Sequence, residues 1–183
     1  LGTFTYDRNM AAIPFGGRYR LVDFVLSNMV NSGITNVGVL ATQHYHSLMD
    51  HLNNAQQYDL NRKNGGLQLL PPFATENVGA NNRGKLDDLR NALDYLETIT
   101  TTPYVLLADA YVVCNIDYRP ALEAHIASGC DITMLATLES EPSQENYVSV
   151  LRADPSHRVT SYALDCVAKA GDYASMGDMI ISR

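Results

Sequence analysis

The sequence predicts an α/β domain whose sheet is mainly parallel and is covered by helices on both faces. Over the first two-thirds of the chain, short apolar runs of strand length alternate with segments of helical periodicity, which is the pattern of parallel strands joined by helices. The 183 residues, of which 46% are hydrophobic and 18% charged, suffice for one domain with its own core. Such sheets bind ligands beyond the carboxyl ends of their strands, here at residues 41–44 and 109–114.

The first half of the chain contains one clear helical pattern. Apolar residues recur at helical spacing from Val22 to Val30, and Gly33 follows where a C-cap glycine belongs. The NVGVL segment after it predicts a buried strand over residues 36–40. Three further segments are expected here: a short strand over residues 1–5, a helix over 44–52, and mostly loop over 61–82, where Gly, Asn and Pro are frequent.

The second half begins with an amphipathic helix over residues 85–99, with leucines on one face and charged residues on the other. Pro120 fits the first position of a helix that runs to Gly129, with Asp117 near enough to cap it. Strands are expected over residues 104–107, 131–138, 147–153, 158–164 and 173–181, the first of them central in the sheet.

Composition argues against several classes of function. The net charge of -7 does not suit a general binder of nucleic acid or of anionic membranes, since both need clustered Lys and Arg. Cys114, Cys130 and Cys166 are odd in number and contain no CxxC pair, so neither a disulfide framework nor a zinc site is indicated. A reducing, cytoplasmic setting fits best, and the sequence has no apolar run of membrane-spanning length and no signal-peptide layout.

The glycine–arginine segment GGRYR has two readings. Gly16, Gly17, Arg18 and Arg20 form either an anion site for a phosphate of a substrate or activator, or a tight turn with solvated arginines before a helix. Asp23, just after it, resembles a catalytic carboxylate, but we interpret it as a cap or brace at the start of the following helix.

Other polar residues are interpreted as structural. Asn28, Asn31 and Ser32 lie in or beside an apolar helix and are expected to bond to main chain across the domain. Cys114 has no evident His or Asn partner and is expected to be an inert thiol.

A histidine-rich segment follows the second expected strand. His44 and His46 are two residues apart and would point in different directions on a helix, and His46 with Asp50 makes too few ligands for a metal. With His51, they are interpreted as ordinary surface residues.

A long motif of uncommon residue combinations, PFGGRYRLVDFVLSNMVNSGITN, fills residues 14–36. Shorter motifs follow in order, among them LLPPF at 69–73, NIDY at 115–118 and YASMG at 173–177. On these motifs the chain resembles, over nearly its whole length, the nucleotidyltransferase domain of the glucose-1-phosphate adenylyltransferases. The resemblance implies a Rossmann-like nucleotidyltransferase domain over residues 1–183. It also implies a longer protein, because the family carries a C-terminal left-handed β-helix domain that these residues do not contain.

The resemblance also implies an activity. Members transfer AMP from ATP to the phosphate of glucose 1-phosphate, which gives ADP-glucose for glycogen and releases pyrophosphate. They use a glycine-rich loop with a basic residue at the ATP phosphates, aspartates that hold Mg²⁺, and a lysine at the sugar phosphate. Carried over by motif, the residues that bind the nucleotide or the sugar phosphate are Thr42, Gln43, Gly84, Ser175, Met176 and Gly177.

The sequence departs from the family at the metal site. The metal-binding aspartate of the family falls on Tyr111, and a neutral phenol cannot hold Mg²⁺ as a carboxylate does. Asp109 lies two residues earlier, on the same face if the strand continues, and replaces the lost carboxylate only if the main chain shifts. Asp117 is the other fallback ligand.

Three more departures concern the phosphates and the base. Only Gly2 remains of the glycine-rich loop. The small Gly-Thr-Ala of the nucleotide pocket falls on Gly84-Lys85-Leu86, where two larger side chains would crowd it. The sugar-phosphate lysine falls on Asp165, which would repel a phosphate.

These four losses resemble the non-catalytic, regulatory-type subunit of bacteria that use two different subunits. The main hypothesis is therefore a regulatory subunit that assembles with a catalytic subunit of the family, expected as a hetero-tetramer, and stimulates it. The alternative is an active nucleotidyltransferase that uses Asp109 or Asp117 with Mg²⁺, the only hypothesis that needs a cofactor. A third hypothesis is a sensor that binds ATP, ADP-glucose or a phosphosugar without turnover.

Overall fold

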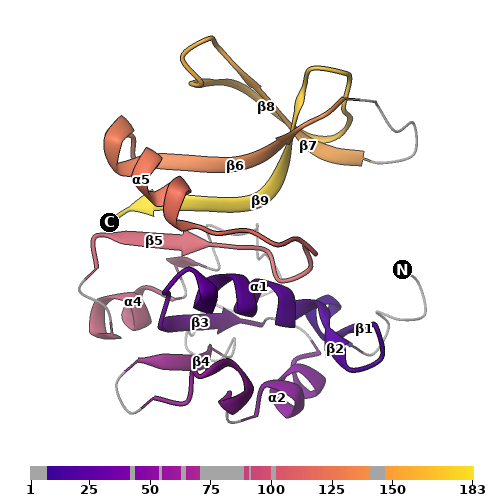
Figure 1. Cartoon of the computed structure of the whole chain (residues 1–183), viewed down its shortest axis with the longest axis vertical. Coiled ribbons are helices and arrows are strands. Elements are labelled where there is room, and N and C mark those ends of the chain that lie inside the picture. Colours follow the sequence, from indigo (N-terminus) through magenta and orange to yellow (C-terminus); the bar gives the residue numbers. More distant parts are fainter. Residues whose placement is uncertain are drawn as a thin grey trace. The chain divides into compact units, whose positions relative to one another are not determined.

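The computed structural model describes residues 8–41, 44–53, 55–62, 65–70, 89–90, 92–99, 102–140 and 147–183. The chain divides into two compact units, which are described separately (Figure 1). The first unit contains Leu1–Thr102 and Ala110–Tyr118, and the second contains Pro103–Asp109 and Arg119–Arg183. The strand expected over residues 1–5 and the start of the helix expected over 85–99 lie outside the described residues.

The first unit combines short helices with two small sheets. Its elements are η2 (Met10–Ala12), β1 (Pro14–Phe15), β2 (Tyr19–Arg20), α1 (Leu21–Asn31), β3 (Asn36–Leu40), α2 (His46–Leu52), η3 (Gln56–Tyr58), β4 (Gly66–Leu70) and α4 (Leu93–Ile99). β1 and β2 form an antiparallel hairpin, whereas β3 and β4 are parallel, with residue 36 opposite residue 66.

Helix α1 forms because its apolar residues occupy one face, and that face is buried. The expected glycine stop is confirmed: Gly33 has a φ of +84°, which glycine adopts without the penalty of a Cβ atom. The amide of Gly33 donates to the carbonyl of Val30 and that of Ile34 to the carbonyl of Met29, both at 2.9 Å. These two bonds make a Schellman motif, which satisfies carbonyls that the end of the helix leaves open.

Strand β4 lies inside the segment that was expected to be mostly loop. It pairs in parallel with β3 over five residues. The strand was not predicted because the sequence around it is rich in glycine and proline, although Leu67, Leu69 and Leu70 are apolar residues typical of a strand.

The second unit is a five-stranded sheet with one helix. Its elements are β5 (Tyr104–Leu107), α5 (Arg119–Ser128), β6 (Ile132–Leu138), β7 (Tyr147–Ala153), β8 (Val159–Val167) and β9 (Tyr173–Ser182). All five strands were expected within a few residues of these bounds. Strand β9 pairs with three strands, β5, β6 and β7, so the centre of this sheet is β9 rather than β5.

The expected mainly parallel sheet is wrong for the described residues. Every pairing in the five-stranded sheet is antiparallel, and only β3 with β4 is parallel. The strand–helix alternation itself is present, because β5 and β6 both run antiparallel to β9 and hence parallel to each other, joined through α5. Strand β9, the last strand in the sequence, lies between β5 and β6. No local pattern in the sequence predicts this placement.

Strand β9 changes its partner along its length. On one side it pairs with β6 at both ends of its run. On the other side its first residues, Tyr173 and Ala174, pair with β7, and its last, from Met179 to Ser182, pair with β5. The two partners on this side therefore meet around residues 175–178.

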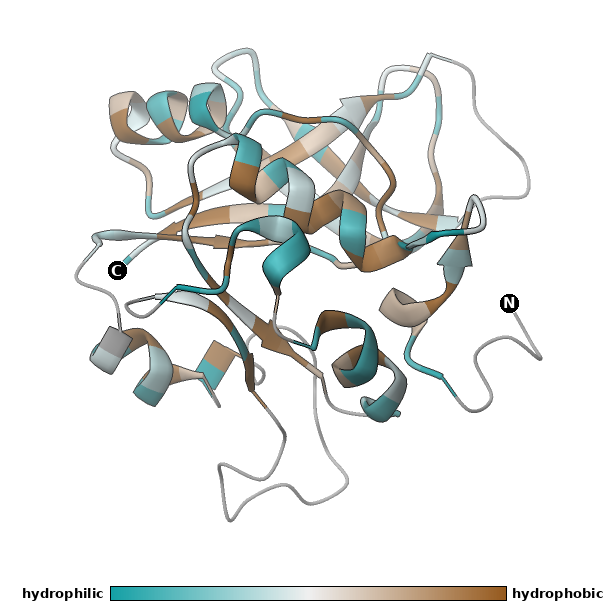
Figure 2. Ribbon diagram, turned by 60° about the horizontal axis from the view of Figure 1, so that its bottom comes forward, coloured by the Kyte–Doolittle hydropathy of each residue, from teal (hydrophilic) through white to brown (hydrophobic). Residues whose placement is uncertain are grey.

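Each unit has an apolar interior. In Figure 2 brown and teal residues alternate along the helices, as expected for elements with one buried face. In the second unit the interior includes a polar residue, His125, whose ring nitrogens lie 2.7 Å from Thr133 Oγ1 and 3.0 Å from Ser182 Oγ. Of the helices that the structure describes, none is both long enough and apolar enough to cross a membrane.

Candidate functional site

A bulge follows Ser175 in β9 and contains the Met and Gly of the Ser-Met-Gly motif together with Asp178. β6 and β9 pair on both sides of Leu135, which alone faces residues 176–178. Gly177 has a φ of +80°, and its amide donates to Ser175 Oγ at 3.1 Å. Residues 175–177 are partly exposed. Bulges of this kind redirect side chains and are frequent beside functional sites.

The residue after this motif is a buried carboxylate. Asp178 is only 1% exposed, and its Oδ1 accepts a hydrogen bond from the amide of Asp109 at 3.1 Å. The structure thus brings Asp109 beside the Ser-Met-Gly bulge. The sequence reasoning missed Asp178, although a lone acidic residue in the otherwise apolar strand YASMGDMII was a signal for it.

Tyr111 and Asp109 do not share a strand face. β5 ends at Leu107, and both residues lie in the loop and turn that follow. The condition for the same-face argument, a strand that continues, is therefore not met. The side chain of Tyr111 is 49% exposed.

The segment that carries Tyr111 is fastened to helix α1. The buried Asn28 donates through Nδ2 to the carbonyl of Cys114 at 3.0 Å and accepts at Oδ1 from the amide of Ile116 at 3.4 Å. Ser32 Oγ accepts from the amide of Tyr118 at 2.9 Å. The structural interpretation of Asn28 and Ser32 is confirmed. Cys114, in the same segment, is not part of a disulfide.

The glycine–arginine segment is a hairpin turn. Gly16 and Gly17, at its tip, have φ values of +59° and +86°, conformations that favour glycine. Arg18 is exposed and forms no ion pair with the residues the structure describes. Arg20 is partly buried, and its guanidinium donates to the carbonyl of Ser47 at 2.5 Å. The structure therefore separates the two arginines: Arg18 faces solvent, whereas Arg20 already has a protein partner.

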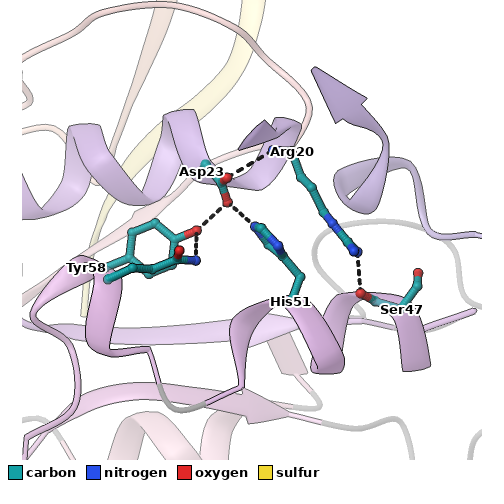
Figure 3. A network of polar contacts seen from close by, with 6 residues as sticks. Arg20, Asp23, Ser47, His51 and Tyr58 are labelled. Atoms are coloured by element: carbon teal, nitrogen blue, oxygen red, sulfur yellow. Dashed lines mark hydrogen bonds and ion pairs between the residues drawn. The ribbon is translucent and has the colours of Figure 1, made fainter. Parts of the chain in front are cut away.

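A buried carboxylate holds this hairpin in place (Figure 3). Asp23 is 6% exposed. Its Oδ2 accepts from the amide of Arg20 at 3.0 Å, and its Oδ1 accepts from the hydroxyl of Tyr58 and lies 2.6 Å from His51 Nε2. Burial, together with the Asp23 carboxylate, raises the pKa of Tyr58. The interpretation of Asp23 as a cap and brace is confirmed.

One histidine is not on the surface. His44 and His46 are exposed, but the side chain of His51 is only 14% exposed and is occupied by Asp23. Among the described residues there is no group of three or more His, Cys, Asp or Glu side chains that could hold a metal ion. The described donors at the family's metal position, the phenol of Tyr111 and the restrained Asp109, do not fit Mg²⁺, which requires several oxygen ligands in octahedral arrangement.

The position of the family's sugar-phosphate lysine lies on strand β8. Asp165 is exposed and has a φ of +50°. It lies in a bulge between the pairs Val148–Cys166 and Val150–Ala163. A carboxylate is therefore presented to solvent where the resemblance requires a cation. Asp117 is exposed too and precedes α5 by two residues.

Several of the suggested ligand residues cannot be placed. Thr42, Gln43 and Gly84, with its neighbours Lys85 and Leu86, lie outside the described residues. The same holds for Gly2 and the start of the chain.

The architecture is that of an α/β protein with the Ser-Met-Gly motif on strand β9. A family model described as "Nucleotidyl transferase" matches residues 1–177. The chain belongs to that family.

Its relatives bear two kinds of name. Over 127 residues, 69% of this chain and 37% of the relative, it is 44% identical to the "Glycogen biosynthesis protein GlgD" of Geobacillus stearothermophilus. It is 40% identical to the GlgD of Bacillus subtilis over 134 residues, 73% of this chain and 38% of the relative. It is 34% identical to the "Glucose-1-phosphate adenylyltransferase" of Pseudothermotoga lettingae over 177 residues, 97% of this chain and 41% of the relative.

These names confirm the resemblance drawn from the motifs, including its GlgD-like type. The chain spans about two fifths of the length of these relatives (37%, 38% and 41%).

Proposed function

We propose that this chain is the nucleotidyltransferase-like part of a regulatory subunit in glycogen biosynthesis. The whole protein assembles with a catalytic subunit of the same family, as a hetero-oligomer with a tetramer as the expected form, and stimulates it. It does not itself make ADP-glucose at the rate of an ordinary member. A cytoplasmic setting belongs to the proposal, on the sequence argument of an odd, unpaired set of cysteines.

The observation that carries the proposal is the residue at the metal position. Phosphoryl and nucleotidyl transfer depend on cations that neutralise several phosphate oxygens. Tyr111 offers a phenol instead of a carboxylate, and Asp109, the nearest replacement in the chain, has its main chain bound to a second side chain at 3.1 Å.

Two further facts support the same proposal. Asp165 presents a negative charge where the family uses a lysine, and a negative charge disfavours a phosphate at that position. Relatives at 44% and 40% identity carry the name "Glycogen biosynthesis protein GlgD" rather than the name of the enzyme.

The test uses the full-length protein. It is assayed with ATP, glucose 1-phosphate and Mg²⁺ for pyrophosphate release, alone and after co-purification with a catalytic subunit from the same organism. We expect no turnover alone, and a catalytic subunit that is faster or more sensitive to activator when the two are together. Turnover by the isolated protein at the rate of ordinary members would rule the proposal out.

The second candidate is an active adenylyltransferase. It is favoured by relatives named glucose-1-phosphate adenylyltransferase that align with 97% of the chain. In that case Mg²⁺ is required and Asp109 or Asp117 replaces the missing carboxylate. Pyrophosphate release that is lost in Asp109→Asn or Asp117→Asn would establish it.

Binding of a ligand without turnover is compatible with both candidate functions. Ser175, Met176 and Gly177 are partly exposed and provide one wall for a nucleotide or phosphosugar. Arg18, exposed at the hairpin tip, is available to an anionic activator. Metal-independent binding of a phosphosugar, measured by calorimetry, would identify the chain as a sensor.

A further inference from the structure

The burial of the Asp178 carboxylate requires an explanation. It is 1% exposed and stands in a strand that is otherwise apolar. Moving a carboxylate out of water is unfavourable unless hydrogen bonds and charges compensate. Its Oδ1 is used as the acceptor for the amide of Asp109.

The sheet register explains why this amide needs an acceptor. Leu107 lies opposite Met179, so an uninterrupted ladder would place Asp109 opposite Gly177. The ladder stops, because residues 176–178 form the bulge opposite Leu135. The amide of Asp109 therefore does not pair within this ladder. It donates instead to the side chain of Asp178.

We propose that Asp178 is a positioning residue that fixes the main chain of Asp109 at the end of β5 and thereby keeps the Asp109 carboxylate from replacing the carboxylate that Tyr111 lacks. This inference rests on the proposed function, in which the metal position is degenerate. For Asp109 to bind the metal in place of residue 111, the main chain would have to shift by up to two residues along the direction of β5. That shift must break the Asp109–Asp178 hydrogen bond and leave the buried Asp178 carboxylate with one fewer donor, which is unfavourable.

The first test measures hydrogen exchange at the Asp109 amide in the full-length protein. We compare the wild type with Asp178→Asn, which keeps the Oδ1 acceptor, and with Asp178→Ala, which removes it. We expect Asp178→Ala to speed the exchange at least about tenfold, the equivalent of one hydrogen bond of about 1.4 kcal/mol, and Asp178→Asn to restore protection. The matched control is Asp131→Ala, which replaces an exposed aspartate just before β6 and should leave exchange at the Asp109 amide unchanged.

If Asp178→Ala does not fold, the wild type and Asp178→Asn decide the outcome of this test. An Asp109 amide that exchanges in the wild type as fast as an exposed loop amide would overturn the inference, and strong protection that is kept in Asp178→Asn would support it.

The second test asks directly whether Asp109 holds the metal. The affinity for ATP is measured with Mg²⁺ and with EDTA, in the wild type and in Asp109→Asn. We expect the Mg²⁺-dependent part of the affinity to be the same in both. A drop of about tenfold or more in Asp109→Asn would mean that Asp109 binds the metal, and the inference would fail. Pyrophosphate release tests the proposed function separately. A protected Asp109 amide in an enzyme that is active alone would therefore contradict the proposed function and leave the positioning of Asp109 by Asp178 supported.

Discussion

The aromatic ring of Tyr95 lies against the main chain of Gly38. A methyl group on Gly38 would lie 2.8 Å from Cε1 of Tyr95, closer than such atoms approach in folded proteins, and 3.0 Å from Cδ1 of Leu70, a tight contact. Glycine at position 38 therefore lets a side chain of α4 reach strand β3. The close approach, rather than an unusual backbone angle, explains the glycine in NVGVL.

The first prediction concerns this contact. Gly38→Ala should destabilise the protein by about 1–3 kcal/mol, because the Tyr95 ring and the Leu70 side chain must move. Urea unfolding followed by circular dichroism measures the loss. The control is Ala124→Gly on α5, which tests only helix propensity and should cost about 1 kcal/mol or less. Gly129→Ala is not a suitable control, because Gly129 has a φ of +62° and an alanine there would be strained. An unchanged midpoint in Gly38→Ala would show that the ring moves away freely.

The second prediction concerns the hydroxyl of the same tyrosine. Tyr95 Oη is buried and has no hydrogen-bond partner among the residues that the structure describes, so those residues do not compensate its desolvation. Tyr95→Phe should be neutral or stabilising by up to about 1 kcal/mol. The matched control is Tyr58→Phe, which should cost about 1.5–3 kcal/mol because the Tyr58 hydroxyl donates to the Asp23 carboxylate. A Tyr95→Phe variant as destabilised as Tyr58→Phe would mean that the Tyr95 hydroxyl has a partner in solution.

The third prediction concerns alkaline pH. Burial and the Asp23 carboxylate raise the pKa of Tyr58 above its ordinary value in the folded protein. Below about pH 10 the tyrosine is neutral in both the folded and the unfolded chain, so its contribution is fully present there. As the pH rises further, the unfolded chain releases a proton that the folded chain keeps, and stability falls by up to about 1.4 kcal/mol per pH unit.

Tyr58→Phe should therefore show a shallower loss of stability between about pH 10 and 11 than the wild type. The free energy of unfolding in urea, measured at several pH values, gives the slope. Tyr162→Phe, in which the replaced side chain is 49% exposed, is the control and should keep the wild-type slope. Equal slopes for the wild type and Tyr58→Phe would contradict the prediction.

Local patterns in the sequence were sufficient for single elements. The spacing from Val22 to Val30 and the glycine at position 33 predicted α1 and its C-cap, because both depend on residues a few positions apart. The functions of Asp23 and Asn28 as braces were predicted as well, since a polar residue in an apolar helix needs a partner. Pairing between distant strands was not predicted, because β9 enters beside β5 from about 70 residues further along the chain.

The candidate site was predictable only in part. The Ser-Met-Gly motif and Asp109 were identified separately, but their proximity depends on the bulge in β9, which no local pattern reveals. The partner of His51 was missed for the same reason, because Asp23 lies on another helix 28 residues earlier.

The fourth prediction separates the two hairpin arginines. Arg18→Ala should weaken the response to an anionic activator and leave stability unchanged, because Arg18 is exposed and forms no ion pair with described residues. Arg20→Ala should also lower stability, by about 0.5–1.5 kcal/mol, because its guanidinium donates to the carbonyl of Ser47. Activation curves with a phosphosugar and thermal unfolding of the same samples measure both effects. If neither variant alters the activation curve, the hairpin is not an anion site.

The last prediction concerns the metal position itself. Tyr111→Asp should raise the affinity for ATP in the presence of Mg²⁺ by about tenfold, the equivalent of about 1.4 kcal/mol for one restored charged ligand. The gain should disappear in EDTA, because a carboxylate without the cation repels the triphosphate. Turnover should remain absent, since the carboxylate at Asp165 and the other departures are unchanged.

Tyr111→Asn is the matched control for this change, because it removes the ring and adds no charge. If Tyr111→Asn raises the affinity as much as Tyr111→Asp does, the phenol blocks the nucleotide by its size and the argument from metal ligation is wrong. If only the aspartate acts, and only with Mg²⁺, then the loss of one carboxylate at position 111 accounts for the missing metal affinity. The neighbouring Asp109, whose amide is bound by Asp178, would then be unable to replace it.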